Sequence, residues 1–280
     1  MPTKKNSICV FIHYSERNCI PHNVQIYVNE LATHFDEVRL LTNKRDIDVI
    51  ADFKENVHLH FEKNEGYDFG MFYKFAITKR LNTYSEITIV NDSNILINNL
   101  ENVFKDGRKQ DVDFWGLIDS NEKPWFSTHE NNYHVQSHFI VLNESAIKAL
   151  SIFLDYFDVD SVFKEENQKA LRRAIINKWE IGFSQHLLKA GLKSYTYIKT
   201  ANDYAKNLAH IKPKELINQG YPLLKKKVFY DLSSKQRVEW ENLLKAKIPK
   251  EWKSDLVIKE LERNRSLVKK SFLKRILPFK

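Results

Sequence analysis

The stretch ITIVNDSNIL, from Ile87 to Leu96, carries the most information about the fold. Its first four residues are β-branched and favour a pleated, half-buried strand, whereas Asn91, Asp92 and Ser93 tend to end a strand because their side chains bond to nearby backbone. In a sheet of parallel strands, ligands bind outside the carboxyl ends of the strands. The pattern therefore predicts a buried strand that brings three small polar side chains to a ligand site. An Asx turn that only ends the strand would give the same pattern.

Similar patterns before this stretch predict the rest of the sheet. Strands are expected at SICVFIHYS from Ser7, EVRLLTN from Glu37 and VHLHFEKN from Val57. Apolar residues at helical spacing follow Pro21, and a second helical run follows Gly70. The order strand, helix, strand, strand, helix, strand indicates an α/β fold with a mostly parallel sheet flanked by helices.

The second half of the chain continues this pattern and then becomes helical. Two further strands, a long helical segment and a short last strand are expected at residues 113–120, 134–143, 166–191 and 194–198. Beyond Pro213 the chain is mostly helical and charged. We therefore expect one α/β domain over residues 1–212 and a helical, basic extension over residues 213–280.

The bulk composition narrows the class of protein. The 280 residues have a formal net charge of +8 and only seven Gly and seven Pro, which is typical of a globular protein. The apolar runs are too short for a membrane span or a signal-peptide core, and Cys9 and Cys19 lack zinc-ligand spacing, so a cytoplasmic setting is expected. The charge suits an anionic substrate or membrane surface better than nucleic acid, because the sequence has no nucleic-acid-binding motif.

Four motifs occur in an order that resembles the rhamnan synthesis F family of bacterial polysaccharide glycosyltransferases. They are NEGYDFGMF (64–72), VNDS (90–93), DFWGL (113–117) and HVQSHFIVLN (134–143). The resemblance runs from about His13 to about Lys225. It implies a GT-A-like, Rossmann-related fold, a donor linked to dTDP or UDP, and a glycan or lipid-linked acceptor. It also implies that a sugar, with rhamnose as the candidate, is transferred with inversion to a growing cell-surface polysaccharide.

The resemblance also implies a donor site at the end of the fourth strand. GT-A enzymes usually carry an Asp-x-Asp there, which holds the diphosphate through Mg²⁺ or Mn²⁺ and so stabilises the leaving group. Asn91-Asp92-Ser93 stands at this position with one carboxylate, so Asp92 is the expected metal ligand. Metal-free catalysis, with Lys or Arg at the diphosphate, is the alternative. The other donor-site candidates are His13, Asn64, Gly66, Asp68 and Gly70, and Asp68 is equally suited to cap a helix.

Glu180 is the candidate catalytic base. An inverting transferase must remove a proton from the acceptor hydroxyl, and a positioned carboxylate can do so. The segment KWEIGFSQHLLKAG, from Lys178, resembles the part of inverting GT-A enzymes in which an acidic residue opens a helix beside the acceptor. A Glu at a helix start is also favourable to the helix dipole alone. The reserve candidates are Asp155, Asp158 and Asp160.

Four further residues are candidates for contact with the acceptor or the transferred sugar. Asp119 follows a strand end, while His134, Gln136 and His138 would share one face of a strand. Residues four apart in a strand are separated by roughly 13 Å, so His134 and His138 are not expected to share a metal ion. Histidines that merely bond within the sheet are the alternative. Trp115 and Gly116 are interpreted as sheet and wall residues.

The C-terminal tail predicts contact with a membrane. Residues 265–280 include six basic and no acidic residues, and apolar residues recur among them at helical spacing. A basic amphipathic helix of this kind lies on anionic lipid, which would place the protein on the inner face of the membrane. A helix that packs on the domain or on a partner protein is the alternative.

The reduced Asp-x-Asp motif leaves open a second function for the whole protein. With one carboxylate at this position, the protein could be a non-catalytic scaffold that binds a glycan or a nucleotide.

Overall fold

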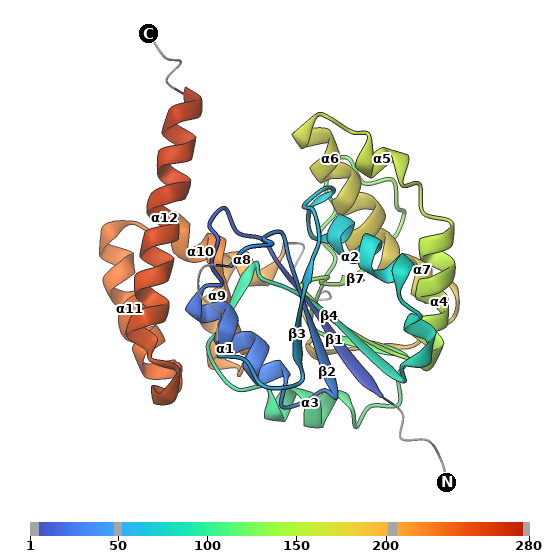
Figure 1. Ribbon diagram of the computed structural model, residues 1–280, viewed down its shortest axis with the longest axis horizontal. Coiled ribbons are helices and arrows are strands. Elements are labelled where there is room, and N and C mark those ends of the chain that lie inside the picture. Colours follow the sequence, from blue (N-terminus) through green and yellow to red (C-terminus); the bar gives the residue numbers. More distant parts are fainter. Residues whose placement is uncertain (1–5, 48–51, 201–205, 277–280) are drawn as a thin grey trace.

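The computed structural model describes residues 6–47, 52–200 and 206–276, with side chains as far as Leu267. A mixed sheet forms its centre, with strand order β3-β2-β1-β4-β8-β6-β7, and β9 pairs with β6 (Figure 1). The strands are β1 Ser7–His13, β2 Glu37–Thr42, β3 Val57–Phe61, β4 Glu86–Asn91, β6 Phe114–Ser120, β7 His134–Val135, β8 Phe139–Asn143 and β9 Ser194–Ile198.

Most of the pairing is parallel. β1 runs parallel to β2 and β4, β2 to β3, and β6 to β9, whereas β8 lies antiparallel between β4 and β6. The predicted α/β class, with a mostly parallel sheet flanked by helices, is thereby confirmed. The single strand predicted at 134–143 is wrong in detail: a turn at Gln136–His138 separates β7 from β8.

Helices cover both faces of the sheet, which explains why β1 is an unbroken apolar run. Cys9 and Phe11 pack in the core beneath α1 and α3, whereas Ile8, Val10 and Ile12 pack in the core beneath the helices of the other face. The first face carries α1 His22–Leu31 and α3 Glu101–Gly107. The second carries α2 Tyr67–Thr78, α4 Glu144–Asp155, α6 Gln168–Ile175 and α7 Gly182–Lys189.

The segment beyond Pro213 adds a strand to the fold as well as helices. Its strand β10 (Leu223–Lys225) pairs antiparallel with β5 (Asn94–Leu96), so it lies against the loop that follows β4. The short helices of the remaining chain are η1 Leu81–Thr83, α5 Asp160–Phe163, α8 Leu208–Ile211, α9 Pro213–Asn218, α10 Lys226–Asp231 and η3 Lys250–Trp252. The segment that follows the predicted boundary between residues 212 and 213 therefore pairs with a strand of the first part of the chain.

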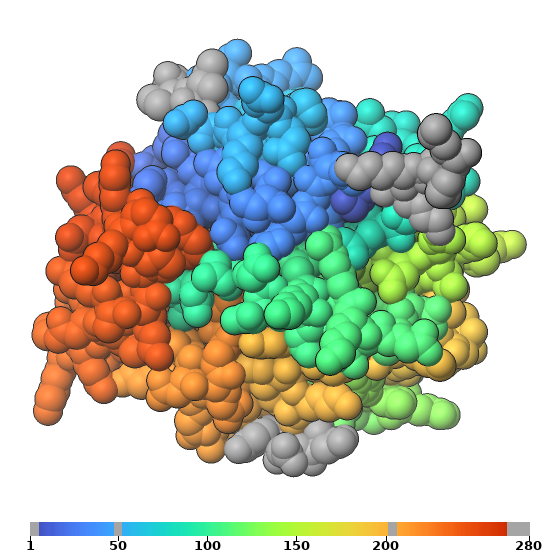
Figure 2. All heavy atoms as spheres, turned by 90° about the horizontal axis from the view of Figure 1, so that it is seen from below, coloured from blue at the N-terminus to red at the C-terminus, as the bar shows by residue number. Residues whose placement is uncertain are grey.

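Two long helices complete the C-terminal segment, α11 Ser234–Lys247 and α12 Ser254–Ile276. Glu260 of α12 accepts hydrogen bonds from the first backbone N–H groups of α1, those of His22 and Asn23, at 2.8 and 3.1 Å. These donors have no partner within α1, so α12 caps that helix. Figure 2 shows the C-terminal segment, in orange and red, against the blue and green parts of the chain.

The tail of α12 reaches past α10 and α11 (Figure 1). Its first basic residue, Arg265, is buried and donates to the carbonyl oxygens of Tyr230 and Leu232 at 3.0 and 2.8 Å. Arg265 thus holds the end of α10 and does not serve as a surface cation. The side chains of the other basic tail residues, Lys269 to Lys280, lie outside the described residues. Among the helices that the structure describes, none is both long and apolar enough to cross a bilayer.

Candidate active site

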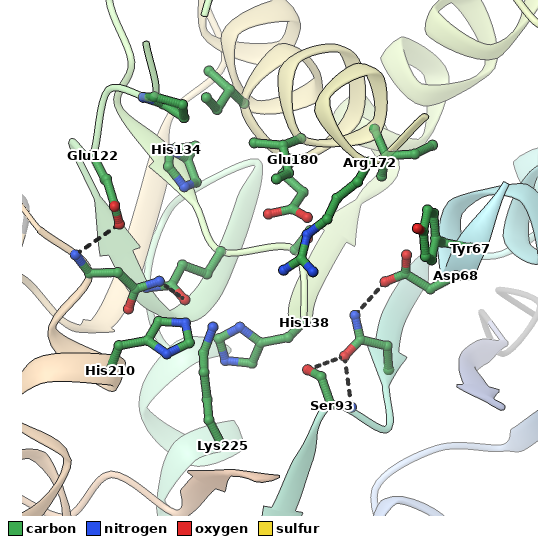
Figure 3. Close-up of a pocket in the computed structure, with 18 of the residues that line it drawn as sticks. Tyr67, Asp68, Ser93, Glu122, His134, His138, Arg172, Glu180, His210 and Lys225 are labelled. Carbon is green, nitrogen blue, oxygen red and sulfur yellow. Dashed lines mark hydrogen bonds between the residues drawn. The ribbon is translucent and has the colours of Figure 1, made fainter. Parts of the chain in front are cut away.

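A cavity of about 650 Å³ lies beyond the carboxyl end of β4, at the edge of the sheet where ligands bind in folds of this kind. Parts of the chain far apart in sequence line it: the start of α2, the end of β4, the turn before β8, the helix from α6 to α7, and the C-terminal segment (Figure 3). Its charged side chains are Asp68, Glu122, Arg172, Glu180, Lys225 and Lys227. The volume suits a small molecule with several polar groups.

Glu180 projects into this cavity from the middle of a long helix (Figure 3). The expectation that it opens a helix is wrong, because Asn167 caps the helix further upstream and α6 continues through a π-helical turn, η2 (Ile176–Ile181), into α7. The N–H of Gly182 donates to the carbonyl of Asn177 and closes this wide turn. A Cβ at residue 182 would lie only 3.0 Å from the same oxygen, so a glycine suits this position. Single π turns inside α-helices are frequent at functional sites.

Aromatic packing places Glu180 beside Asp68. The ring of Trp179, the residue before Glu180, lies 4.8 Å from the ring of Phe69, the residue after Asp68. Trp179 also stacks on Phe183 at 4.9 Å. These large buried rings cannot move without leaving a void. They therefore hold the carboxylates of α2 and η2 on the same wall of the cavity.

The surroundings of Glu180 suit a group that accepts a proton near neutral pH. Burial raises the pKa of Glu180 to about 7, with a further rise from the charge of Asp68, while Lys225 and Arg172 act in the opposite direction. The side chain is partly exposed because it faces the cavity, and protein atoms surround it otherwise. Burial also raises the pKa of Asp68, against a hydrogen bond from Asn91 that lowers it. A base works best when its pKa lies near the working pH.

The three polar residues at the end of β4, Asn91 to Ser93, point in different directions. Asn91 Nδ2 donates to Asp68 Oδ2 at 2.6 Å, and Ser93 Oγ donates to Asn91 Oδ1 at 2.6 Å, so both side chains belong to the cavity wall. Asp92 is not part of the cavity lining and pairs with Lys226, whose Nζ lies 3.1 Å from Asp92 Oδ2. The Asx interaction also holds, since the Ser93 N–H donates to Asn91 Oδ1 at 3.2 Å.

The residues at the Asp-x-Asp position do not fit a divalent cation. The single carboxylate of the motif already has an ammonium group beside it, and hard cations take several oxygen ligands. Within the residues that the structure describes, no three His, Cys, Asp or Glu side chains are grouped as metal ligands. Mg²⁺ or Mn²⁺ as a cofactor therefore stays a prediction that this arrangement does not support.

The remaining donor-site candidates are not part of the cavity lining. His13 is buried at the end of β1, with Nδ1 3.3 Å from Thr42 Oγ1, and burial lowers its pKa to about 4. Asn64 is exposed in the loop before α2. Gly66 has a φ of +76° at the start of α2, and a Cβ on Gly70 would lie 1.7 Å from the carbonyl oxygen of Glu65. Both glycines are thus required by the backbone itself.

The acceptor-site candidates divide into two groups. His134, Gln136 and His138 all line the cavity and are all buried. His138 Nε2 lies 2.8 Å from the hydroxyl of Tyr221, and burial lowers the pKa of this histidine well below its usual value. Asp119 does not line the cavity: it is buried, and its carboxylate accepts hydrogen bonds from the N–H and the hydroxyl of Thr200 at 2.6 and 3.2 Å.

The reserve carboxylates lie outside the cavity lining. Asp158 pairs with Lys178 at 2.7 Å, and Asp160 with Lys164 at 2.9 Å, both at exposed positions. Asp155 ends α4 on the surface. Glu180 is therefore the acidic residue of this set that the fold brings to the cavity.

Several cavity residues were not singled out by the sequence. They are Tyr67, Glu122, Arg172, Asn207, His210, Lys225 and Lys227. Tyr67 has a φ of +55°, a conformation that is unusual for a residue with a side chain, and the turn signalled by Gly66 was its only local sign. The last three come from the segment that follows the main motifs, so no local pattern connects them with a site formed around β4.

The fold and the cavity define an α/β protein with a charged ligand-sized cavity at the carboxyl edge of its sheet. The chain belongs to the rhamnan synthesis protein F family, whose model matches residues 41–278. The resemblance seen in the four motifs is thereby confirmed, and the match continues through the C-terminal segment, beyond Lys225. Among curated protein sequences, none matches the chain significantly.

Solved structures of related arrangement are distant in sequence. The glycosyltransferase GlyE of Streptococcus pneumoniae has 10% identity over 94% of this chain and 64% of its own, with a TM-score of 0.39. A Bacillus anthracis protein described as a glucose-1-phosphate thymidylyltransferase has 10% identity over 70% and 87%, with a TM-score of 0.42. The galactosyltransferase LgtC, in complex with donor and acceptor sugar analogues, has 13% identity over 59% and 69%, with a TM-score of 0.34. These TM-scores are too low to carry a conclusion about the function of this chain.

Proposed function

We propose that this protein is a glycosyltransferase that moves a sugar from a nucleotide-sugar donor to a growing cell-surface polysaccharide. The observation that carries the proposal is Glu180, a carboxyl group of raised pKa that faces cationic side chains across the cavity at the end of β4. Membership of the rhamnan synthesis protein F family supports a role in polysaccharide assembly. Rhamnose, carried by dTDP or UDP, is the sugar that we propose.

The chemistry that we propose is a single displacement with inversion. The acceptor hydroxyl attacks the anomeric carbon while Glu180 takes its proton, and the bond between that carbon and the diphosphate oxygen breaks with its electron pair on the diphosphate. A base of pKa about 7 is half ionised at neutral pH, so it can accept the proton without a further activating group. Asp68 and Asn91, which are joined at 2.6 Å on the same wall, would position the sugar hydroxyls.

A ligand screen tests the proposal without knowledge of the acceptor. Nucleotide sugars of dTDP, UDP and GDP are added at 1 mM, with and without Mn²⁺, and thermal unfolding is followed. At a hundredfold excess over Kd, a ligand that binds only the folded state adds about 2.7 kcal/mol, so the midpoint should rise by about 5 °C or more. Slow release of the nucleoside diphosphate from the same compound should accompany the shift. If no nucleotide sugar shifts the midpoint or is hydrolysed, the protein is not a nucleotide-sugar transferase.

We propose further that the protein acts at the inner face of the membrane, where a lipid-linked acceptor would lie. The support is the run of basic and apolar residues from Leu267 to Lys280 in the sequence. Its part up to Ile276 belongs to α12, which reaches past α10 and α11 (Figure 1). Each cation near an anionic surface adds roughly 1 kcal/mol to membrane binding.

Co-sedimentation with liposomes tests the membrane proposal. The full chain is compared with a version that ends after Leu267, which keeps the buried Arg265 and its contacts. We expect the full chain to pellet with vesicles rich in phosphatidylglycerol at low salt and much less at 0.5 M salt, because salt screens exposed charges. The shorter version should stay in solution. Equal pelleting of both versions would contradict the proposal.

A further inference from the structure

Two basic side chains reach the cavity without a carboxylate partner. Arg172 of α6 and Lys225 of β10 both line it, and neither forms an ion pair within 4 Å with a carboxylate of the described residues (Figure 3). Their basic neighbours differ in this respect, because Lys226 pairs with Asp92 at 3.1 Å and Lys227 with Asp231 at 2.6 Å. The two unpaired cations therefore stand where a ligand would meet them.

Strand pairing fixes Lys225 in a buried position that disfavours its charged form. It ends β10, which the pairing of Leu224 with Ile95 and of Lys225 with Asn94 fixes to the segment after β4. Burial lowers the pKa of Lys225, although the charges of Glu180 and Glu122 partly offset that effect. A desolvated ammonium without a close counter-ion is unfavourable, and a bound anion removes that penalty.

A third group in the cavity lining has an unused hydrogen-bond donor. Gln136 is only 5% exposed and lines the cavity, and its Oε1 accepts a hydrogen bond from Asn207 Nδ2 at 3.0 Å. That bond sets the orientation of the amide, so Nε2 is the free end. Nε2 is buried and has no hydrogen-bond partner among the described residues. A buried donor without a partner destabilises the folded protein, so a ligand acceptor at this point would be stabilising.

We propose that Arg172, Lys225 and Gln136 bind the diphosphate of the nucleotide sugar directly, in the place that a divalent cation takes in many transferases. The inference rests on the proposed function and adds the identity of the diphosphate site. A planar guanidinium fits two phosphate oxygens at once, the ammonium adds a second positive charge, and the amide donates one more hydrogen bond. When the sugar–oxygen bond breaks, the new negative charge on the diphosphate falls next to these groups, which stabilises the leaving group without a metal.

Three features of the structure fit a diphosphate site that needs no metal. The Asp-x-Asp position has one carboxylate, that of Asp92, and this carboxylate already forms an ion pair with Lys226. The described residues contain no group of three metal-ligand side chains. The unpaired cations and the unpaired amide donor converge on one cavity instead, from α6, β10 and the turn before β8.

Calorimetric titration with dTDP, and separately with inorganic pyrophosphate, tests the proposal in 1 mM EDTA. The wild-type protein should bind dTDP in EDTA with a Kd that 5 mM Mn²⁺ changes less than threefold. Arg172→Gln and Lys225→Met should each weaken binding at least tenfold, because a charge-assisted hydrogen bond is worth about 1.5–3 kcal/mol. The matched control is Arg173→Gln, which removes the same charge from the neighbouring residue, stacked over Trp125 at 4.7 Å and outside the cavity lining. Its Kd should stay within twofold of the wild type.

The two variants are not expected to disturb folding. Arg172 is exposed, and Lys225→Met removes a charge that the folded state disfavours, so neither variant should lower the unfolding midpoint. Binding that requires Mn²⁺ and is unchanged in Arg172→Gln and Lys225→Met would overturn the metal-free site but leave the proposed transferase intact. No binding of dTDP, of pyrophosphate or of any nucleotide sugar, with or without Mn²⁺, would overturn both.

Discussion

Glu180→Gln is expected to lower acceptor-dependent sugar transfer by about a thousandfold and to leave donor affinity within threefold of the wild type. General-base catalysis by a positioned side chain contributes about 10²–10⁴-fold, and glutamine has the shape of glutamate but cannot take a proton. Donor binding should persist because the groups proposed for the diphosphate, Arg172 and Lys225, are unchanged. The measurement is initial rate with a polysaccharide or lipid-linked acceptor, together with the Kd of the donor.

The dependence on pH gives a second readout for Glu180. Its pKa of about 7 implies that the wild-type rate rises with pH up to about 7 and then levels, since only the ionised carboxylate accepts the proton. The residual rate of Glu180→Gln should lack this limb. Glu122→Gln, which changes another carboxylate of the cavity lining, serves as the control and should lower the rate less than tenfold. If Glu180→Gln loses donor binding instead of turnover, Glu180 belongs to the donor site and is not the base.

The stability of the same variant should change with pH in a defined direction. A carboxyl group whose pKa is raised by folding binds more protons in the folded state, so the free energy of unfolding falls as pH rises from about 4.5 to about 7. Glu180→Gln removes this loss. Urea unfolding should therefore show the variant to be more stable than the wild type by on the order of 1–3 kcal/mol at pH 8, with little difference near pH 4.5.

Gly70→Ala is expected to destabilise the fold strongly, by about 3 kcal/mol or more. A Cβ at this position would lie 1.7 Å from the carbonyl oxygen of Glu65 and 3.3 Å from the ring of Phe163. The oxygen belongs to the backbone of the turn that leads into α2, so relief of the clash requires that turn to move. Overpacking of this kind typically costs 1–3 kcal/mol and sometimes more. Thermal and urea unfolding of the variant measure the loss.

A second glycine provides the matched control for Gly70. Gly191 has a φ of +79°, but a Cβ added there would have no atom of the described residues within 4 Å, so Gly191→Ala should cost only about 1–2 kcal/mol of backbone strain. A Gly70→Ala protein that unfolds at the wild-type midpoint but has lost donor binding would contradict the structural role and support direct contact with the nucleotide. A protein that has lost stability, yet binds dTDP when cooled, would place Gly70 outside the donor site.

The sequence predicted the sheet well because its signals are local. The β-branched run at Ile87–Val90 forms β4, the apolar repeat after Pro21 forms α1, and the four motifs identified the family. The polar residues at the end of the same strand pointed to one edge of the sheet, and at that edge Asn91 and Ser93 line the cavity. Each of these patterns spans few residues, so strand propensity and helical spacing are sufficient to detect it.

The direction of side chains and the partners of charges depend on distant parts of the chain. Asp92 pairs with Lys226, and Asp119 binds Thr200, and neither contact has a sign in the local sequence. The π turn that aims Glu180 at the cavity arises within a helix whose apolar spacing is ordinary.

The cationic side of the cavity was hidden from the sequence for the same reason. Lys225 belongs to a segment that looked like a basic extension, and only the pairing of β10 with β5 brings it to the end of β4. Arg172 is one of three basic residues of α6, and only the packing of this helix against the other segments turns its side chain toward the cavity. Propensity and periodicity act over a few residues, whereas the charge and the pKa of a site depend on which segments burial brings together.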